Sequence, residues 1–468
     1  MNPSQRPNRL TRRQFLGASA CSGMGTAGLL HTILALRSLN AQTIDGLPAD
    51  APYKALVCVF HYGGNDSNNL LIPRESSAHQ KYLANRTVIG LPLSGILPLN
   101  SLNDSGLDLG LHGSMGGCQT LYNQGNLALL ANVGTLIAPI TLADYRNRTA
   151  AIPDNLFSHS DQQIAWQTSA STMSAAHSQT GWGGRLAEAL MAGQERQSIS
   201  MLISMSGTNF FQVGKTMLPF RPGPGGTPTF KLGQSGRAQD VTRYAAFRSV
   251  LDTEHANLME DAFADLSNKS ILEADTINAA LQGTGSFPTI PNSDLGNQLR
   301  TVAKFIQASG PLGMRRQIFF VSNGGYDLHG DFIAPHAQLM GGVSAALKGF
   351  YDALGSIGMN NSVTTFTASD FNRTYDSNGR GSDHGWGGHY LVMGGAVRGQ
   401  RIYGSYPDPD ILSGNNPLDT GRGRWVPTLG VDPYAATLAK WFGLPSSRMS
   451  DVFPNIGNFD ADIGFLNG

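Results

Sequence analysis

Ionisable side chains cluster in four segments of the sequence, at residues 61–66, 323–329, 369–374 and 381–389. In all of these except 369–374, aspartate and histidine occur together among glycines. Three of these segments follow a short apolar run typical of a strand, and the fourth leads into one. Open α/β sheets place their sites at the carboxyl ends of strands, so we expect the four segments to meet. Carboxylate oxygen and imidazole nitrogen together suit zinc, manganese or iron better than calcium. The pattern predicts a metal site, although each Asp/His pair taken alone is more typical of a capped turn or a surface pair.

A nucleophile is less evident. The best candidate is Ser158, which begins the run SHSDQQ over residues 158–163. Its place before a helical pattern predicts an N-cap, with the hydroxyl at the positive end of a helix where an anionic ester would sit. A cap without chemistry is the alternative interpretation. The sequence contains no Gly-x-Ser-x-Gly elbow, no phosphate-binding P-loop, and no dinucleotide fingerprint after the first strand.

The elements that must position these residues follow an alternating pattern. Short apolar and β-branched runs predict strands at residues 55–60, 127–133, 199–203, 317–321, 363–367 and 390–393. Most are apolar on both faces, as central strands covered by helices should be. Helical patterns lie between them, including residues 339–354 and a segment over 432–443 that opens on Asp-Pro and ends on glycine. The alternation predicts an α/β fold with a mostly parallel central sheet flanked by helices.

Residues 207–310 differ from the rest of the chain. A Pro/Gly-rich loop at 219–228 precedes a long amphipathic pattern over 237–281 and a second helical pattern over 295–308. We interpret this region as a helical cap or insertion.

Outside the first 42 residues the chain has two cysteines, Cys58 and Cys118. Two buried free thiols are expected, and a disulfide is the alternative in an oxidising compartment.

The composition narrows the class of protein. The 468 residues contain 33 basic and 33 acidic side chains, and five of the basic ones are arginines within residues 1–42. The remainder therefore has 28 basic and 33 acidic residues, a slightly acidic balance. It has no basic stripe or nucleic-acid-binding module, so we expect no nucleic-acid partner. No segment after the first 42 residues is long and apolar enough to predict a membrane span.

The first residues resemble an export signal. The pair Arg12-Arg13 precedes a weakly apolar run rich in alanine, glycine and serine, which ends near Ala41. We interpret residues 1–42 as a twin-arginine signal that is cleaved, leaving residues 43–468 in the periplasm or outside the cell. A retained anchor and a lipoprotein at Cys21 are the alternatives; Ala18 stands where a lipobox has leucine. The twin-arginine translocation machinery is thus an expected partner, and its preference for folded cargo hints at a cofactor inserted before export.

These motifs together resemble a large bacterial family, the domain-of-unknown-function family 1501. The similarity runs in order from about Lys54 to Phe465 and rests on the segments HYGGND, SHSDQQ, GYDLH, SDFNRT, DHG and GGAVRG. Members of that family commonly bear twin-arginine leaders, and the family is placed in the alkaline phosphatase and sulfatase superfamily. The resemblance therefore implies an alkaline phosphatase-like sheet with metal ligands at strand ends, and ancestral hydrolysis of phosphate or sulfate esters.

The resemblance also implies which residues act. By position, it suggests one or two divalent ions, zinc or manganese, bound by Asp66, Asp327, His329, Asp370, Asp383, His384 and His389. Ser158 is the nearest counterpart of the superfamily's nucleophile. Two departures from the superfamily pattern leave the ligand set and the number of ions open. A loop separates Asp370 from the Asp383-His384 pair, and the Asp-x-His spacing at Asp327 is shorter than usual.

The leading hypothesis is a metal-dependent hydrolase of anionic esters, in which Ser158 or a water attacks the ester. Arg373 would steady the anionic group by a forked hydrogen bond. The main alternative is a protein of the same fold without turnover, which binds an envelope glycan or lipid or assists an exported partner. A metalloenzyme of another class, such as an oxidoreductase, is a third hypothesis.

Overall fold

The computed structural model describes residues 51–103, 106–170, 179–191, 200–222, 236–253 and 257–467. The predicted leader, with Arg12, Arg13 and Cys21, lies outside these ranges. So does the first residue of the strand predicted at 199–203. Within the described ranges, no helix has the length and apolar character needed to cross a membrane.

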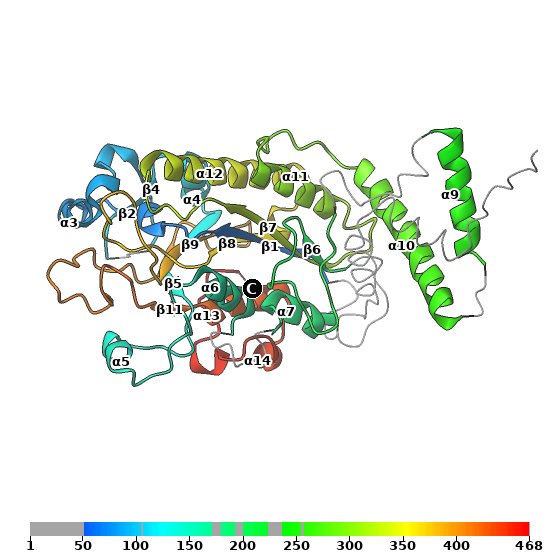
Figure 1. The fold of residues 1–468 in the computed structure, drawn as a ribbon. Coiled ribbons are helices and arrows are strands. Elements are labelled where there is room, and N and C mark those ends of the chain that lie inside the picture. Colours follow the sequence, from blue (N-terminus) through cyan, green and yellow to red (C-terminus); the bar gives the residue numbers. More distant parts are fainter. Residues whose placement is uncertain are drawn as a thin grey trace, which may run out of the picture.

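An eight-stranded sheet forms the centre of the molecule, in the order β10-β5-β9-β8-β1-β7-β6, with β11 also paired to β5 (Figure 1). Its strands are β1 (Lys54–Tyr62), β5 (Leu127–Gly134), β6 (Leu202–Ser204), β7 (Arg316–Gly324), β8 (Val363–Ser369), β9 (Gly388–Met393), β10 (Ile402–Gly404) and β11 (Leu429–Gly430). Each of the six predicted strands therefore corresponds to a strand of this sheet, whereas the short β10 and β11 were not predicted.

The sheet is mixed, so the prediction of a mostly parallel sheet is wrong. Strand β9 runs antiparallel to both of its neighbours, β5 and β8. The pairs β1/β7, β1/β8, β6/β7, β5/β10 and β5/β11 are parallel. A parallel neighbour needs a crossover that carries the chain back along the sheet, usually as a helix. The link from β8 to β9 contains no helix, so the chain returns in the opposite direction.

Both faces of the sheet are covered, which explains why the central strands are buried along most of their length. In β1, Ala55, Val57 and Val59 belong to one buried cluster, whereas Leu56, Cys58 and Phe60 belong to the other. This alternation follows from the two-residue period of a strand. Helices α4 (Gly116–Asn123), α11 (Asp294–Gln307) and α12 (Ile333–Ser356) cover the first face, and α6 (His159–Thr168), α7 (Trp182–Met191), α13 (Val431–Phe442) and α14 (Met449–Val452) cover the second (Figure 1).

The predicted helices at 339–354 and 432–443 correspond to α12 and α13. Helix α13 ends at Gly443, whose φ of 119° is readily adopted only by glycine. The helix begins at Val431, one residue before the predicted segment, and its N-cap is Gly430, so Asp432 lies in the first turn and is not the cap. Both Cys58 and Cys118 are buried and have free thiols, as expected.

The long pattern predicted over 237–281 forms two helices, α9 (Ala238–Leu251) and α10 (Leu258–Gln282). They lie beyond the β6 edge of the sheet in Figure 1. Phe247 and Leu251 of α9 pack with Ala264 of α10, while Ile277 and Leu281 join α10 to the main core. Helix α11 lies in the main core. The boundaries predicted for a separate insertion, 207–310, remain a prediction.

The remaining elements surround the sheet. A second, three-stranded sheet has the order β2-β4-β3, formed by β2 (Leu71–Pro73), β3 (Ile96–Pro98) and β4 (Leu109–His112). Two more α-helices are α3 (Ser76–Arg86) and α5 (Leu142–Asn147). Short 3-10 helices occur at Ser67–Asn69, Thr87–Ile89, Leu93–Gly95, Asn360–Ser362, Ser446–Arg448 and Ile456–Asn458.

The first turn of α13 contains a buried acid that should make stability depend on pH. Asp432 accepts hydrogen bonds from Ser169 Oγ at 2.6 Å and from the Asn455 amide at 3.3 Å, yet burial raises its pKa to about 7. Between pH 5 and 7 the unfolded carboxyl is ionised, while the folded one retains its proton. The folded state therefore loses stability as pH rises through this window, by about 2 kcal/mol.

We expect the Asp432→Asn variant to lack this contribution. Urea unfolding at pH 5, 6 and 7 should show the free energy of unfolding falling more steeply with pH in the unsubstituted protein than in the variant. Equal slopes in the two proteins would contradict the assignment.

Candidate metal centre

The candidate site lies at the carboxyl ends of three adjacent parallel strands, β7, β1 and β8. The loop after β7 contains Asp327 and His329, and the loop after β8 contains Asp370 and Arg373. Helix α6 begins at His159. The loop that leads into β9 supplies Asp383 and His384. Parallel neighbours end at the same edge of a sheet, so these segments meet there although they are far apart in sequence.

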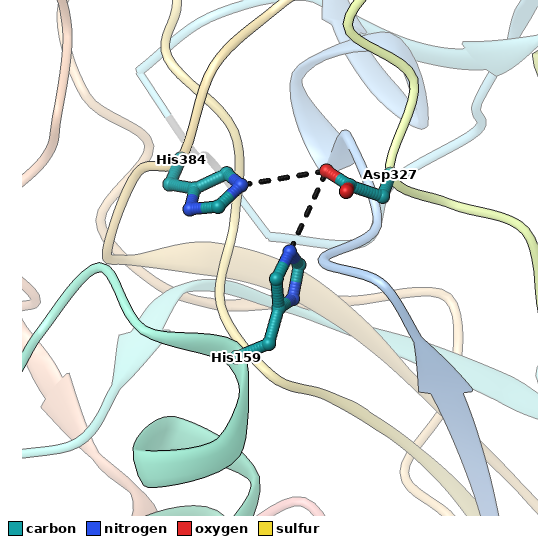
Figure 2. Close-up of side chains that lie close together, drawn as sticks. All are labelled: His159, Asp327 and His384. Atoms are coloured by element: carbon teal, nitrogen blue, oxygen red, sulfur yellow. Dashed lines mark ion pairs between the residues drawn. The ribbon is translucent and has the colours of Figure 1, made fainter.

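Three side chains form the centre of the site: His159, Asp327 and His384. One ligand atom from each lies within 4.8 Å of the others. Asp327 Oδ1 is 3.5 Å from His159 Nε2 and 3.4 Å from His384 Nε2 (Figure 2). The Asp327 side chain is 47% exposed, so the group is open to a molecule from solution.

Hydrogen bonds on the far side of each imidazole determine which nitrogen faces the centre. His384 Nδ1 lies 2.7 Å from the Phe157 carbonyl oxygen, which can only accept, so Nδ1 carries the proton. His159 Nδ1 lies 2.6 Å from Asp370 Oδ2, and its buried Nε2 has no hydrogen-bond partner. When the two rings are neutral, each therefore presents an Nε2 lone pair toward Asp327. A carboxylate or carbonyl behind a histidine is the arrangement that orients metal-binding histidines in proteins.

His329 contributes a third imidazole at the edge of this group. Its Nδ1 is 2.9 Å from Asp383 Oδ1, and its Nε2 is 2.9 Å from Asp327 Oδ1 and 3.2 Å from His384 Nε2. Three Nε2 atoms thus converge on one carboxylate oxygen. Lone pairs facing each other at these distances repel unless a proton or a cation lies between them, so the donor set fits a divalent metal ion.

The charged groups shift the pKa values of the site. The hydrogen bond that His159 Nδ1 donates to Asp370 raises the pKa of His159 against the opposing effect of burial. Burial lowers the pKa of His384. Burial opposes ionisation of Asp327, but the hydrogen bond and charge of Arg373 hold the pKa of its carboxyl below the usual value. Asp327 is therefore an anion at neutral pH, as a metal ligand must be.

Asp370 and Asp383 were both predicted as ligands, and the structure places them behind histidines. Asp370 Oδ2 accepts from the Gly63 amide at 3.1 Å and from Gln163 Nε2 at 3.0 Å, besides its contact with His159. Asp383 accepts from Arg422 Nη1 at 2.6 Å and from Asn378 Nδ2 at 3.0 Å, besides its contact with His329. Each carboxylate thus orients an imidazole.

The loop after β1 approaches the site through Gly63. Its φ is +110°, and a Cβ atom built there would lie 2.7 Å from the Asp327 amide nitrogen. A side chain at this position would push the loop away from Asp327. Glycine therefore allows the Gly63 amide to reach Asp370 while its carbonyl stays 3.3 Å from Arg373 Nη1.

Arg373 is placed behind Asp327. Its side chain is 0% exposed, and Nη1 lies 2.5 Å from Asp327 Oδ1. Its Nη2 donates to the Ser382 carbonyl oxygen at 2.5 Å. The guanidinium predicted to hold an anionic substrate therefore contacts the carboxylate of the site and backbone oxygens.

Ser158 occupies the predicted N-cap position of α6, but its hydroxyl does not bond a helix amide. Its Oγ instead makes a short hydrogen bond to Asp161 Oδ2 and lies 3.2 Å from Ser160 Oγ. Because His159 follows directly in the chain, Ser158 is adjacent to the metal-binding group in sequence.

The remaining predicted ligands, Asp66 and His389, are not in the group of ligand residues found among the described residues. Asp66 is buried, and its Oδ2 lies 2.6 Å from Arg86 Nη2 and 2.6 Å from Ser382 Oγ. His389 Nδ1 accepts from the Asn132 amide at 3.2 Å, and its ring stacks on Tyr406. Asp66 thus neutralises a buried arginine, and His389 lies against an aromatic ring.

The candidate ligand that the sequence analysis did not name is His159. It stands beside Ser158 in the segment 158–163, where the pattern indicated a helix start and drew attention to the hydroxyl. A histidine at the start of a helix, in a chain with three other Asp/His segments, was the available signal. Only the packing of α6 against the end of β8 shows that its ring enters the site.

Comparison with known proteins places the chain in a family without an assigned activity. The family described as "Protein of unknown function (DUF1501)" matches residues 53–410. The chain has no match among curated proteins. One similar solved structure is the PsFucS1 sulfatase from Pseudoalteromonas sp., at 12% identity and a TM-score of 0.33, over 91% of this chain and 73% of the sulfatase chain.

Replacement of Asp66 separates a structural role from metal binding. We expect Asp66→Asn to lower the free energy of unfolding by about 3–5 kcal/mol, because it leaves the buried Arg86 charge without its partner. Metal affinity of the folded fraction should stay unchanged. Asp331→Asn, at an exposed aspartate, is the matched control. Urea unfolding and metal titration measure the two effects; lost metal binding with unaltered stability would make Asp66 a ligand.

Proposed function

This chain belongs to the DUF1501 family, and from the geometry of its site we propose that it is a metal-dependent hydrolase of phosphate or sulfate esters. The observation that carries the proposal is the convergence of three imidazole Nε2 atoms on Asp327 Oδ1, at 2.9–3.5 Å. The position of this group at the carboxyl ends of parallel strands, in a sheet covered on both faces, supports an alkaline phosphatase-like fold.

His159, Asp327 and His384 would hold the ion, with His329 as a further ligand beside them. Two or three nitrogens and one carboxylate oxygen are typical of zinc and are also compatible with manganese. When bound, such an ion supplies positive charge that polarises an ester oxygen and stabilises the developing anion. Asp370, Asp383 and the Phe157 carbonyl keep the imidazoles in the tautomers that binding requires.

Ser158 is the proposed nucleophile. Its hydroxyl donates to the Asp161 carboxylate, which is therefore placed to take the proton as the oxygen attacks. Its place at the start of α6 favours binding of an anionic group by the helix N-terminus. In this proposal Asp161 is the general base, and Ser158 Oγ bonds to the phosphorus or sulfur of the substrate as its bond to the alcohol oxygen breaks. The alcohol leaves, and a water molecule then hydrolyses the seryl ester to release phosphate or sulfate and restore Ser158.

A non-catalytic envelope protein, which binds a glycan or lipid on the same fold, is the second candidate. The specific observation in its favour is that the Ser158 hydroxyl faces Asp161 and Ser160 in this structure. For either function we propose periplasmic or external localisation through the twin-arginine translocation machinery, on the evidence of Arg12-Arg13.

Metal binding tests the site directly. We expect the purified protein to contain zinc or manganese, and His159→Gln to weaken affinity more than 100-fold, because it removes a ligand. Asp370→Asn should weaken affinity by about 10–100-fold, because it removes only the carboxylate that orients His159. The control is His79→Gln, since His79 lies in α3 and bonds the Leu91 carbonyl. Mass-spectrometric metal analysis and titration measure this; a metal-free protein from metal-replete medium would exclude the proposal.

Activity distinguishes the two candidate functions. We expect turnover of aryl phosphates or aryl sulfates, with kcat reduced about 10²–10⁴-fold in Asp161→Asn through loss of the base. Ser158→Ala should be at least as impaired, while both variants keep their metal. Ser356→Ala, at an exposed serine that ends α12, is the control. Metal-replete protein without turnover of either substrate class would favour the binding function.

A further inference from the structure

We infer that Arg373 is a fixed cation that occupies the place of a second metal ion, so that the centre binds one divalent ion per chain. The inference rests on the proposed metal site and adds the number of ions and the role of this arginine. It depends on what surrounds the guanidinium, on which side of Asp327 it lies, and on the remaining carboxylates nearby.

The guanidinium lies among oxygen atoms. Asp327 Oδ1 is at 2.5 Å and the Gly63 carbonyl oxygen at 3.3 Å from Nη1, and the Ser382 carbonyl oxygen is at 2.5 Å from Nη2. One carboxylate and two carbonyl oxygens are also ligands that a hard divalent cation would take. We call these three oxygens, from Asp327, Gly63 and Ser382, the cradle of Arg373. Because an arginine side chain stays protonated in proteins, the cradle always contains a positive charge.

Asp327 Oδ1 therefore contacts a guanidinium and also faces the imidazole group. The guanidinium is fully buried, whereas the His159 and His384 side chains are partly exposed and lie 3.5 and 3.4 Å from the same oxygen. In a two-ion centre a carboxylate often connects the ions. Here the buried side of that carboxylate is already neutralised, and a divalent ion placed there would meet a like charge.

The nearby carboxylates offer no second ligand group. Asp370 Oδ2 accepts from three donors, and its Oδ1 is buried without a hydrogen-bond partner. Asp383 accepts from His329, Asn378 and Arg422. Asp66 is paired with Arg86 and Ser382. Within the described part of the chain, the only group of three or more such residues with ligand atoms in reach is His159, Asp327 and His384.

Arg373 is therefore a positioning residue in this scheme. It holds the Asp327 carboxylate in place, and its guanidinium provides a positive charge whether or not metal ions are available. Its complete burial means that it acts on a substrate through Asp327 and the ion, and not by direct contact.

Manganese stoichiometry of the purified protein tests the inference. We expect one Mn²⁺ per chain by equilibrium dialysis and electron paramagnetic resonance, and one in Arg373→Lys, which keeps the charge. Arg373→Ala opens the cradle and should bind a second Mn²⁺, which added methylguanidinium should displace. Circular dichroism confirms folding, and Arg373→Gln replaces the alanine variant if that variant does not fold.

Two Mn²⁺ per chain in the unsubstituted protein would overturn the inference and leave the proposed metal site standing. A folded Arg373→Ala that still binds one ion would overturn it equally. Absence of any bound ion from the unsubstituted protein would instead remove the proposed metal site, and the inference with it.

Discussion

The buried Asp370 carboxylate connects segments that are hundreds of residues apart in the chain. Its Oδ2 accepts from the Gly63 amide after β1, and it pairs with His159 Nδ1 and Gln163 Nε2 of α6. Buried carboxylates are costly unless each is well satisfied, so these donors are held together strongly. The His159 ring can reach the Asp327 loop only because this carboxylate orients it. The rest of the site depends on that constraint.

Compensation of charge organises the surrounding residues in the same way. Arg373 neutralises Asp327 from the interior, Arg422 pairs with Asp383, and Arg86 pairs with Asp66. Each pair fixes an acidic side chain in one orientation. In two cases that side chain faces or supports an imidazole, whereas Asp66 supports the packing beneath the site. Asp–Arg pairs thus have two roles in this protein. At Asp327 and Asp383 they belong to the candidate metal centre, whereas at Asp66 the pair stabilises the fold.

Much of the fold follows from local pattern. Runs such as 55–60 and 391–393 are apolar on both faces because helices cover both sides of the sheet, and this is visible in the sequence without knowledge of the partners. The direction of β9 is not visible in that way. Its apolar residues would look the same in a parallel strand, and its orientation depends on a helix-free link from β8. Pairing between distant strands is a property of the assembled sheet.

The sequence by itself determined that Asp and His residues follow strand ends and that a helix begins after Ser158. The tertiary structure alone decided which of the acidic residues face the centre and which stand behind it. Asp327 and Asp383 have similar local sequences around them, but one carboxylate meets three imidazoles and the other meets Arg422 and Asn378. A role of this kind is set by the direction of a side chain and by its partners across the fold. The local sequence does not specify the direction of the side chain or its partners, because both depend on contacts that form only when β7, β8 and α6 pack together.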